Sequence, residues 1–107
     1  MQDSLIIIDD DTPFRERLSR SMEKKGFEVE SYGMAKEAKI RLIDKEFDYA
    51  IVDMRLEDGS GLEIIKSIKS SFPNTKSLLL TGYGNIATAV AAIKSGAIDY
   101  LPKPAEV

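Results

Sequence analysis

Short apolar runs alternate along the chain with stretches in which apolar residues recur every three or four positions. The runs cover residues 5–8, 49–52, 78–80 and 97–101. Short apolar runs bounded by polar residues and turn formers are typical of buried parallel strands. Each run leads into residues that could carry chemistry: Asp9-Asp10, Asp53, Thr81 and Lys103.

A further strand is predicted at residues 27–30, where alternating polar and apolar positions indicate a sheet edge with one wetter face. Four helices are predicted between the strands, because apolar residues there recur at helical spacing. The helices are expected to start at Thr12-Pro13, near residue 35, at Gly59-Ser60-Gly61 and at Ile86. Their predicted core residues are Phe14, Leu18 and Met22; Ala35, Ala38, Leu42 and Ile43; and Leu62, Ile65, Ile68 and Phe72.

This alternation of strands and helices predicts an α/β fold, with a doubly wound parallel sheet covered on both faces. The 107 residues are expected to form one domain over residues 1–107. Ligands of such sheets bind beyond the carboxyl ends of the strands. The residues that follow the apolar runs are therefore predicted to share one site.

The amino-acid composition limits the metal ligands, the kinds of catalysis and the partners to be expected of this chain. The chain has no Cys and no His, which excludes disulfides, thiolate or imidazole metal ligands and histidine catalysis. The net charge of −3 gives no argument for nucleic-acid binding, so no nucleic-acid partner is expected for this domain. No apolar run approaches the ~20 residues of a membrane span, and no secretory signal is evident. A cytoplasmic protein without a membrane partner is expected.

Three carboxylates, those of Asp9, Asp10 and Asp53, are predicted at the ends of neighbouring strands. Each pair at ~4 Å would repel by about 4 kcal/mol at an effective dielectric constant of 20. A hard divalent cation such as Mg²⁺ relieves this repulsion, because it prefers oxygen ligands. The alternative is that the acids at positions 9–11 cap the first helix, whose start favours negative charge.

Thr81 and Lys103 favour the chemical interpretation. A carboxylate such as that of Asp53 can attack phosphorus and form an aspartyl phosphate. The transferred group then needs hydrogen-bond donors and positive charge at its oxygens, which a hydroxyl and an ammonium group supply. The alternatives are a turn-capping threonine and a solvated lysine, but the coincidence of all these groups at successive strand ends argues against them.

These motifs resemble the receiver domain of two-component response regulators over nearly the whole chain. The matching residues are Ile6-Ile7-Ile8-Asp9-Asp10-Asp11, Val52-Asp53-Met54-Arg55-Leu56 with Gly61, Leu80-Thr81-Gly82 and Asp99-Tyr100-Leu101-Pro102-Lys103-Pro104. The resemblance implies a flavodoxin-like five-stranded sheet of order 2-1-3-4-5. It also implies that the chain is similar to redox-responsive regulators, which carry a Fis-like output domain.

The resemblance implies a role for each site residue. Asp53 is the expected phosphoacceptor. Asp10, Asp53 and the Arg55 backbone carbonyl are expected to bind Mg²⁺ directly, with Asp9 assisting through water. Thr81 is expected to contact the phosphoryl group.

Lys103 is the second expected phosphoryl contact. Tyr100 falls on the aromatic position that acts with Thr81 as a switch in this family. Tyr83 and Arg55 are expected to affect the lifetime of the phosphorylated form. The Lys103–Pro104 bond is expected to be cis.

The implied function is a signalling switch that accepts a phosphoryl group on Asp53 from a sensor histidine kinase. The chain would be the regulatory part of a transcriptional regulator, and not an enzyme beyond its own phosphorylation and dephosphorylation. One alternative is a Mg²⁺-dependent phosphatase with an aspartyl nucleophile, although Arg55 stands where such enzymes place a second Asp. Another is a receiver-fold interaction module that is not phosphorylated, although none of the site residues is missing.

Two departures from the family pattern are evident. Glu57 stands where family members often have proline, a change expected to leave the chemistry untouched. The fifth helix that usually follows the Lys-Pro turn is missing from the sequence or truncated, as in a piece of a longer regulator. An uncovered sheet face beside Phe14, Leu18 and Met22, or the fourth helix and fifth strand, is expected to support self-association.

Overall fold

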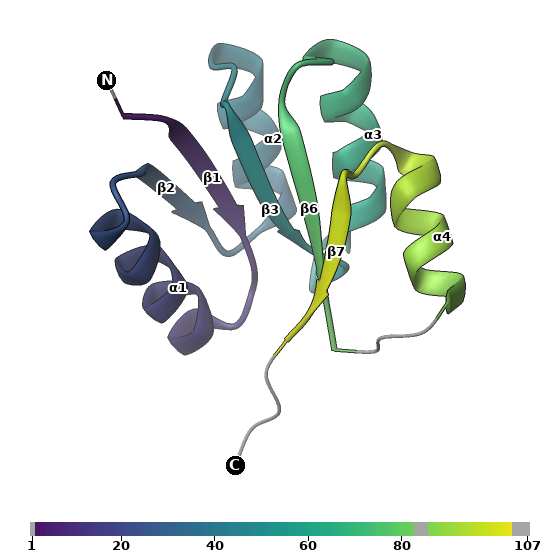
Figure 1. Ribbon diagram of the computed structural model, residues 1–107, viewed down its shortest axis with the longest axis horizontal. Coiled ribbons are helices and arrows are strands. Elements are labelled where there is room, and N and C mark those ends of the chain that lie inside the picture. The colour runs from purple at the N-terminus through teal and green to yellow at the C-terminus, as the bar shows by residue number, and fades with distance from the viewer. Residues whose placement is uncertain (1, 83–85, 104–107) are drawn as a thin grey trace.

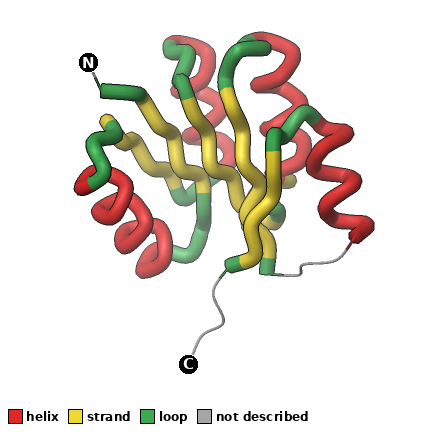
Figure 2. Tube along the Cα trace, in the orientation of Figure 1, coloured by secondary structure: helices red, strands yellow, loops and turns green. Residues whose placement is uncertain are grey.

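A five-stranded parallel sheet forms the centre of the computed structural model, which describes residues 2–82 and 86–103 (Figures 1 and 2). Its strands, in spatial order, are β2 (Glu28–Tyr32), β1 (Ser4–Ile8), β3 (Tyr49–Asp53), β6 (Lys76–Thr81) and β7 (Asp99–Pro102). The helices are α1 (Thr12–Lys24), α2 (Ala35–Asp44), α3 (Gly61–Ser71) and α4 (Ile86–Ser95). Apart from the small hairpin described below, this is the predicted strand order 2-1-3-4-5.

The sheet is covered on both faces, as the fold class predicted. Leu5, Ile7 and Ile51 beside the apolar stripe of α1 are buried, so the expectation of an uncovered sheet face there is wrong. Ile6 and Ile8 of β1 belong to a core cluster with buried residues of α2, α3 and α4. Leu5 and Ile7, which alternate with them, face the opposite side and pack against the apolar stripe of α1. Figure 1 shows the same arrangement, with α1 on one side of the sheet and α2, α3 and α4 on the other. Within the described segments, no helix is long and apolar enough to cross a membrane.

Two helices turn their core faces slightly away from the predicted ones. Ile43 was expected in the core but is 81% exposed, since successive helical residues point about 100° apart and the buried face of α2 runs through Ala35 and Ala38. In α3 the sequence prediction omitted Ile64, which is 1% exposed and belongs to the core with Ile65.

The sequence did not predict the antiparallel hairpin of β4 (Arg55–Leu56) and β5 (Gly59–Ser60), which lies between β3 and α3. It was assigned instead to a turn and a helix start. The start of α1 also differs slightly, because Asp11 is its N-cap. The Asp11 carboxylate accepts a hydrogen bond from the Phe14 amide at 3.1 Å. Capping therefore applies to one of the three consecutive acids.

Some expectations fall outside the described residues. They are the role of Tyr83, the isomer of the Lys103–Pro104 bond, and the chain beyond Lys103.

The edge strand β2 is tied to α2 by an ion-pair cluster around Glu30. Its carboxylate accepts hydrogen bonds from Arg41 at 2.7 and 3.0 Å, from Tyr32 at 2.8 Å and from Lys45 at 3.4 Å. The hydrogen bonds and positive charge of Arg41, together with the other two groups, outweigh the burial of Glu30. They lower its pKa from 4.5 to about 2.

Glu30→Gln is expected to lower the free energy of unfolding at pH 7 by about 1–2 kcal/mol, after allowance for solvent screening of a partly exposed pair. Because the folded-state pKa of Glu30 is depressed, its stabilisation is complete above pH 4.5 and is lost as the pH falls towards 2. Urea unfolding of both proteins between pH 2 and 7 measures this. A stability difference that does not shrink at low pH would contradict the assignment.

Candidate functional site

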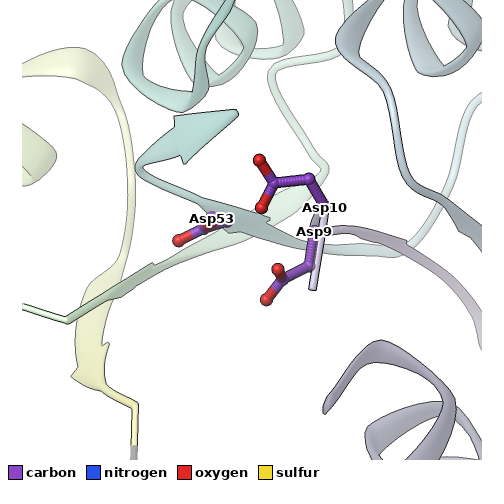
Figure 3. Close-up of side chains that lie close together, drawn as sticks. All are labelled: Asp9, Asp10 and Asp53. Carbon is purple, nitrogen blue, oxygen red and sulfur yellow. The ribbon is translucent and has the colours of Figure 1, made fainter. Parts of the chain in front are cut away.

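Three carboxylates converge at the carboxyl end of the sheet (Figure 3). Asp9 follows β1 directly and Asp53 ends β3, and these two strands pair in parallel with Ile8 beside Val52. Asp9 is 0% exposed, Asp53 is 7% exposed, and Asp10 is half-buried. One oxygen from each acid lies within 4.8 Å of the others. The structure therefore brings together the acids that the strand-end pattern predicted.

Lys103 joins this cluster. A backbone hydrogen bond from Lys103 to the carbonyl of Thr81, 2.8 Å long, fixes it beside the end of β6. Its ammonium nitrogen lies 2.9 Å from Asp9 Oδ2 and 3.5 Å from Asp53 Oδ2, and 5.1 Å from the centre of the Phe14 ring. The sequence had suggested a phosphoryl contact, and in this structure the amine is paired chiefly with Asp9.

Thr81, the last residue of β6, is 1% exposed. Its hydroxyl oxygen lies 3.8 Å from Met54 Sδ, a contact that the sequence did not suggest. A small cavity of about 170 Å³ opens at this point, lined by Asp53, Met54, Arg55, Thr81, Gly82 and Lys103. The hydroxyl, the ammonium group and the Asp53 carboxylate thus border one space.

Two other predicted residues lie at the margin of this group. Arg55 is exposed on β4 and lines the same cavity. Tyr100 lies on β7 opposite Leu79 and is half-buried against the main core cluster, so it is not among the residues that line the cavity.

Glu57, which stands where family members often have proline, contacts the acid cluster through its backbone. Its backbone amide donates a hydrogen bond to Asp10 Oδ2 at 2.8 Å. A proline at this position would have no N–H to donate. The hairpin therefore holds one of the acids, and the absence of proline was the sequence signal for it.

Arg15 was also not among the site residues predicted from the sequence. It lies on α1, half-buried, and its Nη1 donates a hydrogen bond to the backbone carbonyl of Asp9 at 2.7 Å. The guanidinium lies so close to Gly33 that a Cβ there would be 2.6 Å from Nη1. Arg15 thus fixes the backbone that carries Asp9. Its position one helical turn after the Asp triplet was only a weak signal in the sequence.

Burial raises the pKa of Asp53 from 3.8 to about 6. The negative charges of Asp9 and Asp10 act in the same direction, and Lys103 opposes them. For Lys103, burial alone would lower the pKa of the amine, but the hydrogen bond and charge of Asp9 and the charge of Asp53 raise it overall. At neutral pH the amine is charged and Asp53 is mostly ionised, so it can act as a nucleophile.

The contribution of Asp53 to the stability of the metal-free protein is expected to fall as the pH rises from about 4 to 7. Asp53 binds its proton more tightly when folded, so its favourable contribution is complete below pH 3.8 and is lost as the pH passes about 6. The loss should be on the order of 2–3 kcal/mol. Urea unfolding in a chelator, compared between the parent and Asp53→Asn, measures it. Equal pH slopes in the two proteins would refute this assignment.

The donor set fits a hard divalent cation. The three acids offer only oxygen ligands, which Mg²⁺ and Ca²⁺ prefer. The buried Asp9 Oδ2 receives no hydrogen bond among the described residues, and its contact with Lys103 is an ion pair without hydrogen-bond geometry. A cation would neutralise acids that the folded chain holds close together and mostly out of water.

Residues 5–107 match the family model for the response regulator receiver domain, and the chain belongs to this family. It is 50% identical over 103 residues to the photosynthetic apparatus regulatory protein RegA of Rhodovulum sulfidophilum, a match that covers 96% of this chain and 56% of that protein. The chain spans about half the length of curated relatives that it matches.

Solved structures agree with the fold. A response regulator from Burkholderia pseudomallei, solved with a phosphorylated aspartic acid, a calcium ion and citrate, superimposes with a TM-score of 0.90 at 37% identity. That match covers 98% of this chain and 62% of the other. The beryllofluoride-activated NtrC4 receiver domain dimer superimposes with a TM-score of 0.88 at 30% identity, covering 96% of this chain and 85% of the other. Receiver domains of this family are signalling domains that bind divalent cations at such an acidic pocket.

Proposed function

We propose that Asp53 is the phosphoacceptor of this receiver domain and that its phosphorylation operates a signalling switch. The observation that carries the proposal is the convergence of Asp53 with two further acids, the Thr81 hydroxyl and the Lys103 ammonium group around one small cavity. Receiver domains take their phosphoryl group from sensor histidine kinases, and such a kinase is the proposed donor here.

In the proposed reaction, an ionised oxygen of Asp53 attacks the phosphorus of a phosphohistidine. The new O–P bond forms while the N–P bond breaks, and the electron pair of that bond leaves with the imidazole. Asp53 has two properties that suit it to this role. It borders an open cavity, and with a pKa near 6 it is mostly ionised at neutral pH. Hydrolysis of the acyl phosphate later resets the switch.

Mg²⁺ is the proposed cofactor, held by Asp10, Asp53 and the Arg55 backbone carbonyl, with Asp9 acting through water. When bound, the ion would neutralise negative charge on the phosphoryl oxygens and among the acids. Neutralisation of the acids would also weaken the hold of Asp9 on the Lys103 amine. The amine would then be available to the phosphoryl group, as the resemblance implied.

Thr81 is the proposed link between chemistry and signal. Its hydroxyl lies near Met54 Sδ, a weak acceptor. A phosphoryl oxygen is a stronger, charged acceptor and would draw the hydroxyl towards Asp53. This movement would change the space beside β6, and Tyr100, half-buried on the neighbouring strand β7, would respond as the second part of the switch.

The test of this function is phosphorylation by a small donor. The chain is incubated with acetyl phosphate and Mg²⁺, and its intact mass is measured. A gain of one phosphoryl group that disappears when the cation is chelated supports the proposal, and the absence of any gain under both conditions overturns it. Continuous hydrolysis of small phosphate esters over many turnovers would favour the phosphatase alternative. No observation among the described residues supports that alternative.

We also propose that the chain acts as the regulatory part of a transcriptional regulator and associates with itself. Its match to about half of RegA, a regulatory protein, supports the first point. Large exposed apolar side chains on α4, on β7 and directly before β7 support the second, as does the dimer formed by the similar NtrC4 receiver. These side chains are Ile86, Val90, Ile93, Ile98 and Leu101. Sedimentation over a wide concentration range tests self-association, and a strict monomer with and without phosphorylation would refute it.

A further inference from the structure

The start of α2 is capped from another part of the chain. Met34 occupies the N-cap position and makes no side-chain cap hydrogen bond. The carboxylate of Asp58 instead accepts hydrogen bonds from the backbone amides of Ala35, at 2.7 Å, and Lys36, at 3.0 Å. It thereby satisfies two of the amides that a helix leaves open at its first turn. These two hydrogen bonds also lower the pKa of Asp58, so the cap is charged at neutral pH.

The residue before Asp58 is tied to the acid cluster. Glu57 donates its backbone N–H to Asp10 Oδ2 at 2.8 Å. Two adjacent residues of one hairpin therefore make different contacts. Glu57 holds Asp10, a predicted metal ligand, and Asp58 holds the start of α2. The chain between these two anchors is only one peptide unit long, so a movement of either anchor is transmitted to the other.

The hairpin depends on these anchors for its position. Strands β4 and β5 have only two residues each, and isolated hairpins of this kind are not stable in water. The hairpin lies close against α2, because a Cβ added to Gly59 would be 3.1 Å from the Ala35 Cβ. Leu56 inserts into the core cluster that contains Ala35. Without the Asp58 anchor, the polar turn of the hairpin would be held to α2 chiefly by these apolar contacts.

We infer that Asp58 is a positioning residue of the phosphorylation site. By fixing the hairpin to α2, it holds the Glu57 amide against Asp10 and so orients that carboxylate for a divalent cation. The inference rests on the proposed function, in which Asp10 and Asp53 hold that cation. Coupling between two sites is reciprocal, so cation binding should also stabilise the first turn of α2.

Affinity for Mn²⁺, measured by electron paramagnetic resonance of the free ion, tests the inference. Asp58→Ala should weaken binding about threefold to tenfold, because partners of metal ligands commonly affect affinity by tenfold or more and Asp58 acts one step further away. Asp58→Asn, which keeps one acceptor oxygen but loses the charge, should remain within about twofold of the parent. Asp48→Ala is the matched control, since it removes a carboxylate that accepts two hydrogen bonds from Ser4, away from the acid cluster.

A second readout does not depend on cation affinity. In the parent, Mg²⁺ should slow hydrogen exchange of the Ala35 and Lys36 amides severalfold more than it slows exchange elsewhere in α2. In Asp58→Ala this selective effect should disappear. If Asp58→Ala does not fold, Gly59→Ala serves in its place, because the added methyl group presses the hairpin away from Ala35 while the carboxylate remains.

The possible results distinguish failure of the Asp58 inference from failure of the proposed function. A parent chain that binds no Mn²⁺ and is not phosphorylated would overturn the proposed function, and the positioning role of Asp58 would fall together with it. A parent that binds Mn²⁺ while Asp58→Ala matches Asp48→Ala would overturn only the role of Asp58. Equal weakening in Asp58→Ala and Asp58→Asn would also overturn that role, because it would point to loss of negative charge and not of position.

Discussion

Asp53→Asn is expected to abolish the mass gain of one phosphoryl group from acetyl phosphate. The amide that replaces the carboxylate has no ionised oxygen to attack phosphorus. Asp9 is fully buried against Lys103, and Asp10 is held by the Glu57 amide, so neither acid replaces Asp53. Intact-mass measurement over the time course that labels the parent completely gives the result, and labelling of Asp53→Asn at the parental rate would refute the assignment.

Asp48→Asn provides the matched control for this prediction. Asp48 directly precedes β3 and Asp53 is its last residue, and the substitution is chemically identical. Asp48 accepts hydrogen bonds from Ser4 and takes no part in the acid cluster. Phosphorylation of Asp48→Asn at close to the parental rate, beside none in Asp53→Asn, separates loss of the phosphoacceptor from a general effect of losing a charge next to β3.

The same substitution should increase stability when no cation is present. At pH 7 the buried Asp53 carboxylate is ionised despite a pKa raised to about 6, so the folded chain carries a cost that asparagine removes. A variant that is more stable but inactive is the usual sign of a strained functional group. This stability change therefore points to the same residue as the loss of phosphorylation, by an independent measurement.

The strand ends were predictable from the sequence because a buried parallel strand appears as a short, continuous apolar run. Each apolar run could occupy only the inside of the sheet, and the residue after it had to emerge at the carboxyl edge. The positions of Asp9, Asp53 and Thr81 follow from this pattern alone. Their convergence followed once strands 1 and 3 were placed side by side, as the structure has them.

Contacts between distant segments were not predictable in the same way. The hydrogen bond between Glu57 and Asp10 joins residues 47 positions apart, and the pair formed by Lys103 and Asp9 joins residues 94 apart. Neither leaves a periodic pattern, because each joins single residues that lie beyond the ends of the strands. The exposed Ile43 has a related cause: an apolar residue at helical spacing shows amphipathicity, but the exact buried face depends on what packs against it.

Gly61 could be identified from the sequence, but the reason for a glycine at this position could not. It appeared among the family motifs. A turn conformation that only glycine adopts is not the reason, because Gly61 does not have a positive φ angle. A Cβ built there would collide with the backbone carbonyl oxygen of Asp53. The Gly61 amide also donates a hydrogen bond to the Met54 carbonyl at 2.9 Å, which keeps α3 close against the end of β3.

Gly61→Ala is therefore expected to lower the free energy of unfolding by about 3 kcal/mol, since overpacking against a rigid neighbour costs 1–3 kcal/mol or more. The obstructing atom is backbone, so no side chain can rotate away, and the end of β3 or the start of α3 must move. Phosphorylation should also slow, because that movement displaces Asp53 itself. Gly82→Ala is the control: it lies beside the same cavity, but among the described residues no atom beyond its chain neighbours lies within 4 Å of its added Cβ. Urea unfolding monitored by circular dichroism measures both variants, and a Gly61→Ala protein as stable as Gly82→Ala would show that the backbone absorbs the methyl group at little cost.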